Sequence, residues 1–126
     1  ALLCLDVLEH LVDPWEAVKK LQGFLRPGGV LIASLPNIRY YKVTIPLVVL
    51  GRFEYRKAGI LDRTHLRFFV LETGRKLLTT EHLKVKRTQG LNRLKPLRKD
   101  WIYNVLTLGR MRELFTEQFL VIAEKR

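Results

Sequence analysis

Residues 6–11, with the sequence DVLEHL, decide the fold when they are read together with residues 25–32, LRPGGVLI. The first stretch closes an apolar run with two acids and a histidine, and the second leads through Pro-Gly-Gly into another apolar run. The residues between them suffice for one helix. The pattern therefore predicts a strand, a helix and a strand, with polar chemistry at the carboxyl end of the first strand, where open α/β sheets bind their ligands.

Hydrophobic periodicity extends this pattern along the chain. It predicts buried strands at 2–8, 30–35, 83–88 and 119–123, and helices at 14–25, 71–83 and 100–115. Asp13 and Pro14 mark a helix start, because aspartate caps helices and proline fits their first position. An apolar run at 40–53, interrupted by Pro46, predicts a short broken helix, and residues 59–69 read as an irregular polar loop.

Composition limits the class of protein. The chain has 126 residues, enough for one domain, and its formal net charge of +11 favours acidic partners. The basic residues are scattered, however, and neither zinc-finger spacing nor an RNA-binding aromatic signature occurs, so we expect no nucleic-acid partner. The single cysteine, Cys4, reads as a buried residue and excludes an internal disulfide. With no signal peptide or membrane-span pattern, we expect a cytoplasmic protein.

The element order, the Leu-x-Pro-Gly-Gly-x-Leu turn at 25–31 and the run GILDRTHLRFF at 59–69 resemble the second half of a class I S-adenosylmethionine-dependent methyltransferase of the type 11/type 23-like kind. The resemblance implies an α/β fold, with a partial Rossmann-like sheet made of the family's strands four to seven and the last strand antiparallel beside the fifth. It implies S-adenosylmethionine as cofactor. The run at 59–69 looks like a subgroup associated with glycan and small-molecule methylation, which implies transfer to an oxygen, or less favourably a nitrogen, of a sugar or small metabolite.

Two motifs of that family do not occur in the sequence. These are the glycine-rich turn that holds the methionine part of the cofactor and the acid that holds its ribose. The one glycine pair, Gly28-Gly29, precedes a strand and lacks the following helix of a nucleotide loop. We therefore expect 1–126 to be a single partial domain of a longer enzyme, inactive and poor at binding S-adenosylmethionine by itself, with 38–69 as an insertion over the acceptor site.

The candidate catalytic residues are Glu9, His10 and His65. Glu9 and His10 follow the first strand, near where the methyl group would meet its acceptor, and His65 could join them from the polar loop. A histidine beside a carboxylate suits proton removal from an acceptor, because its ordinary pKa lies near ~6.5. The alternative for Glu9 and His10 is a charge cluster at a helix entry, where acids are favoured by the helix dipole.

The resemblance also suggests binding residues. Those near the cofactor's methionine part are Leu5 and Asp6, and those near the substrate are Asn37, Tyr41, Asp62 and Arg67. An alternative for the polar loop is an ion pair of Asp62 with Arg63 or Arg67. The pattern Asp-x-x-Glu-His is also similar to the metal-binding set of some quinone-biosynthesis methyltransferases, but we predict the site without a metal.

Two other functions compete with the enzyme: a non-catalytic interaction module derived from a methyltransferase, and a basic nucleic-acid-binding domain. The expected partner is a glycan or small-molecule acceptor. Residues 40–53 read as an acceptor lid, as a peripheral membrane contact or as ordinary core. The apolar strand at 2–8 would form an unpaired sheet edge, so we expect a homodimer through it.

Overall fold

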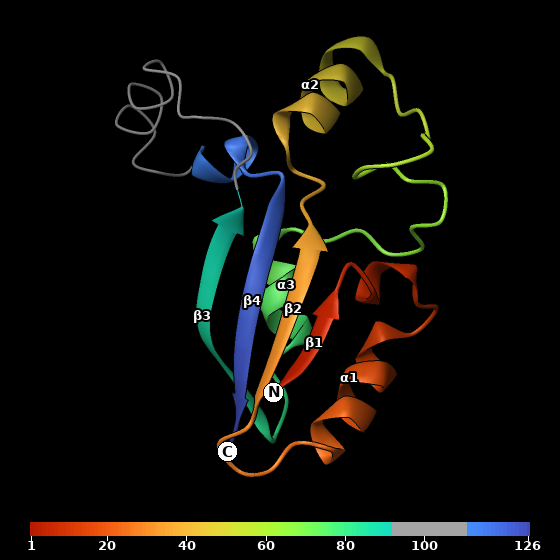
Figure 1. Cartoon of the computed structure of the whole chain (residues 1–126). Coiled ribbons are helices and arrows are strands. Elements are labelled where there is room, and N and C mark those ends of the chain that lie inside the picture. Colours follow the sequence, from red (N-terminus) through yellow and green to blue (C-terminus); the bar gives the residue numbers. More distant parts are fainter. Residues whose placement is uncertain (92–110) are drawn as a thin grey trace.

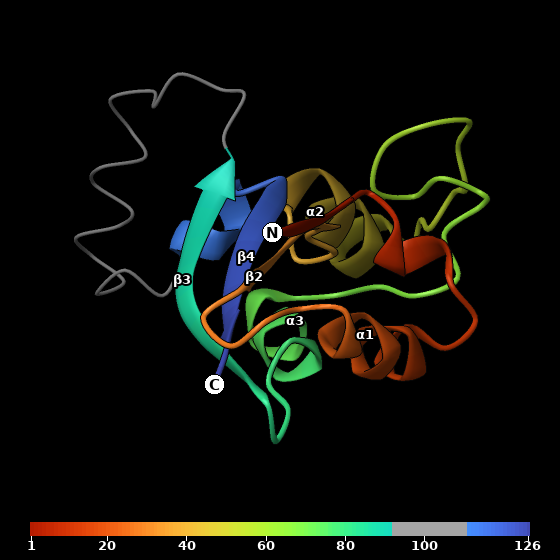
Figure 2. The ribbon, with the colours of Figure 1, turned by 60° about the horizontal axis from the view of Figure 1, so that its bottom comes forward.

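The computed structural model describes residues 1–91 and 111–126. Its elements, in chain order, are β1 (Leu2–Leu5), the 3₁₀ turn η1 (Leu8–His10), α1 (Pro14–Gly23), β2 (Val30–Pro36), α2 (Tyr41–Leu50), α3 (Leu71–Leu77), β3 (Leu83–Leu91), the 3₁₀ turn η2 (Arg112–Phe115) and β4 (Gln118–Lys125). The strands form one four-stranded sheet in the order β1-β2-β4-β3. Helices α1 and α3 cover one face of this sheet (Figures 1 and 2).

The sheet has the expected topology. Strands β1 and β2 are parallel, and β4 inserts between β2 and β3 and runs antiparallel to both. The last strand, β4, thus lies antiparallel beside β2, as the resemblance implied. The predicted α/β class, with the last strand antiparallel in a mixed sheet and with flanking helices, is confirmed.

The hydrophobic core lies between the sheet and the two helices. Alternate residues of the central strands, such as Leu31 and Leu35 on β2 and Val121 on β4, are buried against α1 and α3. Cys4 is buried in the same core, as predicted, and burial raises the pKa of its thiol. This layer follows directly from the period of two that strands impose on their side chains.

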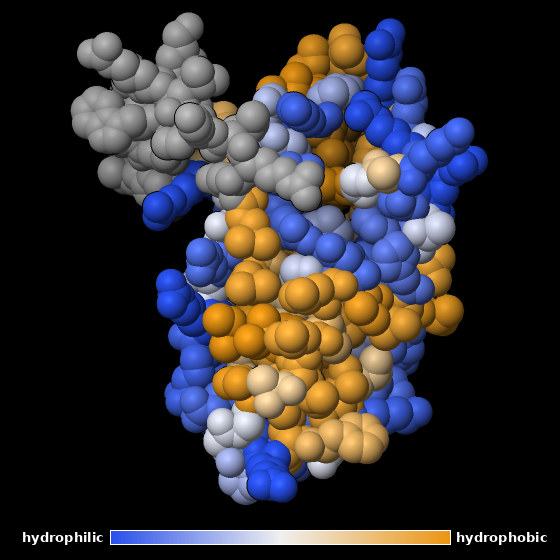
Figure 3. Space-filling view, viewed as in Figure 1, coloured by the Kyte–Doolittle hydropathy of each residue, from blue (hydrophilic) through white to orange (hydrophobic). Residues whose placement is uncertain are grey.

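The opposite face of the sheet carries apolar side chains that no helix of the described residues covers. Leu3 and Leu5 of β1 are 62% and 53% exposed. Ile32 and Ile122 continue the row across the sheet, since Leu3 pairs with Ile32 and Ile32 with Ile122. Figure 3 shows this face as a broad apolar surface. A patch of this kind typically marks a protein contact.

Several predicted boundaries were wrong. The first strand ends at Leu5 rather than residue 8, because Asp6 adopts a left-handed φ of 53° that stops the ladder. The helix predicted at 71–83 ends at Leu77, and the following strand extends to Leu91. The helix predicted at 100–115 lies mostly outside the described residues, and its described end is the 3₁₀ turn η2.

The start of α1 and the end of α2 have clear local causes. The side chain of Asp13 accepts a hydrogen bond of 2.9 Å from the backbone N–H of Glu16, so the predicted cap of α1 is confirmed. The predicted broken helix is instead one continuous helix, α2, with Pro46 inside it. It ends at Leu50 and is capped by Gly51, whose φ of 64° is a left-handed conformation that glycine adopts without strain.

Residues 38–69 form a cap above the carboxyl ends of β1 and β2 (Figure 1). The cap has a small core of its own, made of Tyr40, Val43, Ile60 and Leu61. Burial, followed by the neighbouring Tyr41, raises the pKa of Tyr40 to about 12. Within the described ranges, no helix is both long and apolar enough to cross a membrane.

Candidate active site at the carboxyl ends of β1 and β2

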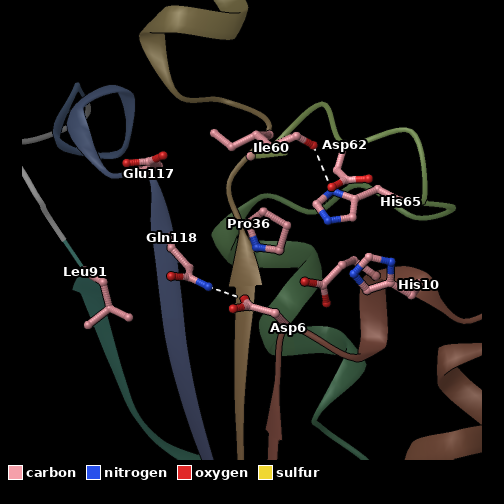
Figure 4. Close-up of a pocket in the computed structure, with 11 residues that line it drawn as sticks. Asp6, His10, Pro36, Ile60, Asp62, His65, Leu91, Glu117 and Gln118 are labelled. Carbon is pink, nitrogen blue, oxygen red and sulfur yellow. Dashed lines mark hydrogen bonds between the residues drawn. The ribbon is translucent and has the colours of Figure 1, made fainter. Parts of the chain in front are cut away.

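A pocket of about 500 Å³ opens where β1 and β2 end beneath the cap (Figure 4). Its lining combines the turn after β1, the end of β2, the polar loop of the cap and the start of β4. The lining residues are Asp6, Glu9, His10, Pro36, Gly59, Ile60, Asp62, His65, Leu91, Glu117 and Gln118. The pocket therefore lies at the sheet edge that the sequence pattern pointed to.

Asp6 is fixed at the mouth of β1 by three hydrogen bonds. Its backbone N–H donates to Ser34 Oγ at 2.9 Å, and the Ser34 hydroxyl donates back to Asp6 Oδ1 at 2.9 Å. The side-chain amide of Gln118 donates to the same oxygen. These bonds hold a non-glycine residue in a left-handed conformation, which turns the chain from the strand into the pocket.

Glu9 is the most deeply buried acid of the pocket. Its residue is 1% exposed, and within the described ranges its Oε2 atom has no hydrogen-bond partner. Removal from water raises the pKa of this carboxyl, and the nearby charge of Asp6 acts in the same direction. The Glu9 backbone carbonyl accepts hydrogen bonds from the N–H groups of Leu66 and Arg67, at 2.8 and 3.0 Å. The turn at Glu9 thus anchors the polar loop of the cap.

The rings of the two pocket histidines are in an edge-to-face arrangement, with centroids 4.7 Å apart and planes inclined by 72°. The Nδ1 atom of His10 lies 3.1 Å from the carbonyl oxygen of Thr64, and Nδ1 of His65 lies 2.9 Å from that of Ile60. Because a carbonyl only accepts, each Nδ1 carries the hydrogen, which leaves Nε2 of each neutral ring as an unprotonated base. One ligand atom each of Glu9, His10 and His65 lies within 4.8 Å of the others.

Asp62 stabilises the turn of the loop that positions His65. Its carboxylate accepts hydrogen bonds from the backbone N–H and the hydroxyl of Thr64, at 2.8 and 2.7 Å, and these bonds lower the pKa of Asp62. The loop is therefore closed by this local turn and not by the alternative ion pair of Asp62 with Arg67. Arg67 instead donates from Nε to the carbonyl of Val12 at 3.1 Å and lies over the Trp15 ring.

The structure brings five predicted residues to the pocket: Asp6, Glu9, His10, Asp62 and His65. Four others do not line it: Leu5, Asn37, Tyr41 and Arg67. The Leu5 side chain lies on the open sheet face, because strand residues alternate and its neighbour Cys4 faces the core. Tyr41 contacts the rings of Tyr40 and Phe115 instead.

Asn37 has a structural role that the sequence did not reveal. The residue is fully buried, and its amide donates to the carbonyls of Glu113 and Thr116, at 2.7 and 2.6 Å. Its Oδ1 atom accepts from the backbone N–H of Arg39 at 3.0 Å. These hydrogen bonds use both ends of the Asn37 amide and tie η2 to the end of β2. The geometry of Asn37 therefore gives no support to its predicted substrate contact.

Sequence reasoning missed the contribution of β4 to the pocket. Glu117 and Gln118 line it because β4 is antiparallel, which places its first residues at the carboxyl ends of β1 and β2. The expected antiparallel insertion was the signal that could have identified them. Asp13, and not Glu9, caps α1, whereas Glu9 lies in the 3₁₀ turn η1 beside the two histidines.

Comparison with known proteins supports the fold. The chain is similar to a DUF574 family protein from Streptomyces avermitilis, with 12% identity, a TM-score of 0.55 and 98% of this chain covered. It is also similar to a SAM-dependent methyltransferase from Archaeoglobus fulgidus, with 17% identity, a TM-score of 0.53 and 98% coverage. The chain spans only 43% and 57% of those two proteins, about half of their length. No family model and no curated protein matches the sequence.

Proposed function

We propose that this chain forms the acceptor side of an S-adenosylmethionine-dependent methyltransferase that methylates an oxygen of a sugar or small metabolite. The observation that carries the proposal is the group of Glu9, His10 and His65 at the carboxyl ends of β1 and β2, in a methyltransferase-like fold. The pocket volume of about 500 Å³ matches a small-molecule site.

The residues fit the proton transfer that such a reaction needs. An acceptor hydroxyl in the pocket would lose its proton to Nε2 of His10 or His65, while its oxygen attacks the methyl carbon in line with the breaking bond to sulfur. The Glu9 carboxylate lies close enough to stabilise the charged imidazole. The backbone bonds to Thr64 and Ile60 hold both rings in the required tautomer.

S-adenosylmethionine supplies the methyl group when it is bound. Among the described residues, Asp6 fits the methionine end of that molecule, because its second carboxylate oxygen stays available beside the pocket after Oδ1 has bonded Ser34 and Gln118. The glycine-rich turn and the ribose acid are not among the residues of this chain. We therefore expect weak, millimolar binding by the chain itself.

A nuclear magnetic resonance titration with S-adenosylhomocysteine tests the proposal. We expect the amides of residues 5–10 to shift at millimolar ligand, and the Asp6→Ala variant to lose these shifts while keeping a folded spectrum. Shifts confined to other parts of the chain, or none at all, would contradict the proposal. In a methyl-transfer assay of the complete enzyme, since the chain alone is expected to be inactive, we expect His10→Gln and His65→Gln to lower turnover about 10²–10⁴-fold, with His82→Gln, outside the pocket, as the matched control.

One observation favours a second candidate, the interaction module. The open sheet face exposes Leu3 and Leu5, and a partner that covers them would bury apolar surface without any chemistry at the pocket. In that case His10→Gln and His65→Gln would leave the partner complex unchanged, whereas Leu3→Lys would disrupt it.

A further inference from the structure

We propose that Glu9, His10 and His65 bind a divalent transition-metal ion through one carboxylate oxygen and two imidazole nitrogens. The site joins the turn after β1 to the polar loop of the cap, across 55 residues of sequence. The three candidate ligand atoms all lie within 4.8 Å of one another. No such ion is needed to explain the fold, so the proposal rests on the chemistry of the donors.

The first argument is the orphaned oxygen of Glu9. A buried carboxylate oxygen without a donor is costly, and native structures rarely leave one unpaired. Glu9 Oε2 is such an atom within the described part of the chain, and the residue is 1% exposed. A cation bound in the pocket would give Glu9 Oε2 the partner that it lacks among the described residues.

The second argument is the way in which the histidines are held. Metal-bound histidines almost always donate their other ring N–H to a carbonyl or carboxylate, which fixes the ring and directs the free nitrogen to the ion. His10 and His65 both have this arrangement, through the carbonyls of Thr64 and Ile60. Figure 4 shows the two rings on the same side of the pocket.

The donor set indicates the class of ion. Two imidazoles and one carboxylate suit zinc, iron, cobalt or manganese in the divalent state, whereas magnesium and calcium prefer oxygen alone. Ligands at ~2.1 Å from an ion lie roughly 3–3.5 Å apart. A pair of ligand atoms at the full 4.8 Å must therefore converge by about 1.3–1.8 Å, through rotations of the histidine and glutamate side chains. The remaining coordination positions would face the pocket.

This set differs from the one that the sequence pattern brought forward, Asp6 with Glu9 and His10. Asp6 Oδ1 already accepts hydrogen bonds from Ser34 and Gln118, and Asp6 is not one of the three convergent residues. The structure replaces it with His65 of the cap. Binding of the ion would thus fasten the cap to the sheet as well as fill the site.

Metal binding does not depend on the proposed reaction, but its role in that reaction does. This inference rests on the proposed function: in the ion-bound form His10 and His65 would be ligands and no longer bases, and the ion would instead bind the acceptor hydroxyl and lower its pKa, so that its proton leaves to water. The metal experiment uses no methyl donor, and the S-adenosylhomocysteine titration uses no metal. Failure of one therefore leaves the other intact.

The test is a titration of the chelator-treated chain with Co²⁺, followed by visible absorption, and with Zn²⁺, followed by thermal unfolding. We expect one equivalent of Co²⁺ to give a visible ligand-field spectrum, and Zn²⁺ to raise the melting temperature. Glu9→Gln and His65→Gln are expected to weaken binding more than about 100-fold, since even the loss of a residue that only orients a metal ligand costs about 10–100-fold. His82→Gln and Asp6→Asn are expected to change it less than about threefold.

A measurement on the unmodified chain guards against variants that fail to fold. With ¹⁵N-labelled histidine, Zn²⁺ should shift the Nε2 resonances of His10 and His65 and leave those of His82 in place. Absence of a stoichiometric cobalt spectrum would overturn the proposal. Loss of binding in Asp6→Asn together with retention in His65→Gln would also overturn it, in favour of the set that contains Asp6.

Discussion

Replacing Glu9 by glutamine is expected to stabilise the fold, against the usual effect of changing a buried residue. The Glu9 side chain is buried with one unpartnered oxygen, and an unsatisfied buried acceptor costs about 1–3 kcal/mol. A neutral amide is cheaper to bury than a carboxylate, and its NH₂ group can donate to an imidazole nitrogen of the site. We expect a gain of about 1–2 kcal/mol in the free energy of unfolding at pH 7, or roughly 3–10 °C in melting temperature.

The pH dependence of this gain provides an internal check. Because burial raises the pKa of Glu9, the folded chain holds its proton more tightly than the unfolded chain does. Wild-type stability therefore receives a contribution that is complete below the ordinary glutamate pKa and is lost as the pH rises through the raised one. Glutamine has no such loss. The advantage of Glu9→Gln should be small at pH 4 and grow toward pH 7.

Urea unfolding of the chelator-treated chain at several pH values measures both effects. The control is Glu81→Gln, an exposed acid in the turn before β3, which we expect to change stability by less than about 0.5 kcal/mol at every pH. A Glu9→Gln variant that is less stable than wild type at pH 7 would refute the reasoning. It would mean that the carboxylate has a stabilising partner in solution.

Other predictions follow from packing, burial and the exposed edge. Gly74→Ala should lower the free energy of unfolding in urea by about 1–3 kcal/mol, because the new Cβ would lie 2.9 Å from Cδ1 of the buried Leu35. In the control, Gly23→Ala, the new Cβ meets no atom within 4 Å, so the free energy of unfolding should stay the same or rise by up to ~1 kcal/mol. Because the pKa of Tyr40 is raised to about 12, the free energy of unfolding of the wild type should fall as the pH rises from 10 to about 12, and Tyr40→Phe should reduce this fall. The same pH dependence of stability in both proteins would contradict this prediction. Light scattering should find a wild-type homodimer that Leu5→Lys shifts toward monomer, and a folded wild-type monomer at high concentration would exclude pairing through β1.

Local sequence signals predicted the elements well where the chain obeys simple periodicity. Strand β2 reads as a mostly apolar run because it pairs with β1 on one side and β4 on the other and packs one face against the helices, and Asp13 with Pro14 marks the start of α1 as expected. The order of the sheet is not encoded in such periods. It came from the resemblance, and the pairing of β4 with β2 confirms it.

The contacts within the site could not be read from local patterns. The sequence suggested that His65 could join His10, 55 residues earlier, but no local pattern predicts that the two ring centroids lie 4.7 Å apart. That contact depends on the backbone of Glu9, which accepts two hydrogen bonds from the loop, and on the turn at Asp62. The substrate contact of Asn37 stays a prediction; in the structure its side-chain amide donates to the carbonyls of Glu113 and Thr116 and so holds η2, which no local pattern indicated.

Polar residues in the pocket differ from polar residues elsewhere in the fold in their hydrogen bonding and backbone conformation. The side chains of Asp13 and Asn37 hydrogen-bond to backbone groups, and each stabilises the element that it joins. Asp6 and Glu9 break local rules instead, one with a left-handed backbone outside glycine and the other with a buried, unpartnered carboxylate oxygen. Sequences are generally consistent with their folds except at functional sites, where such costs are tolerated for chemistry. Both exceptions line the same pocket as His10, which is why we place the function there and not on the open sheet face.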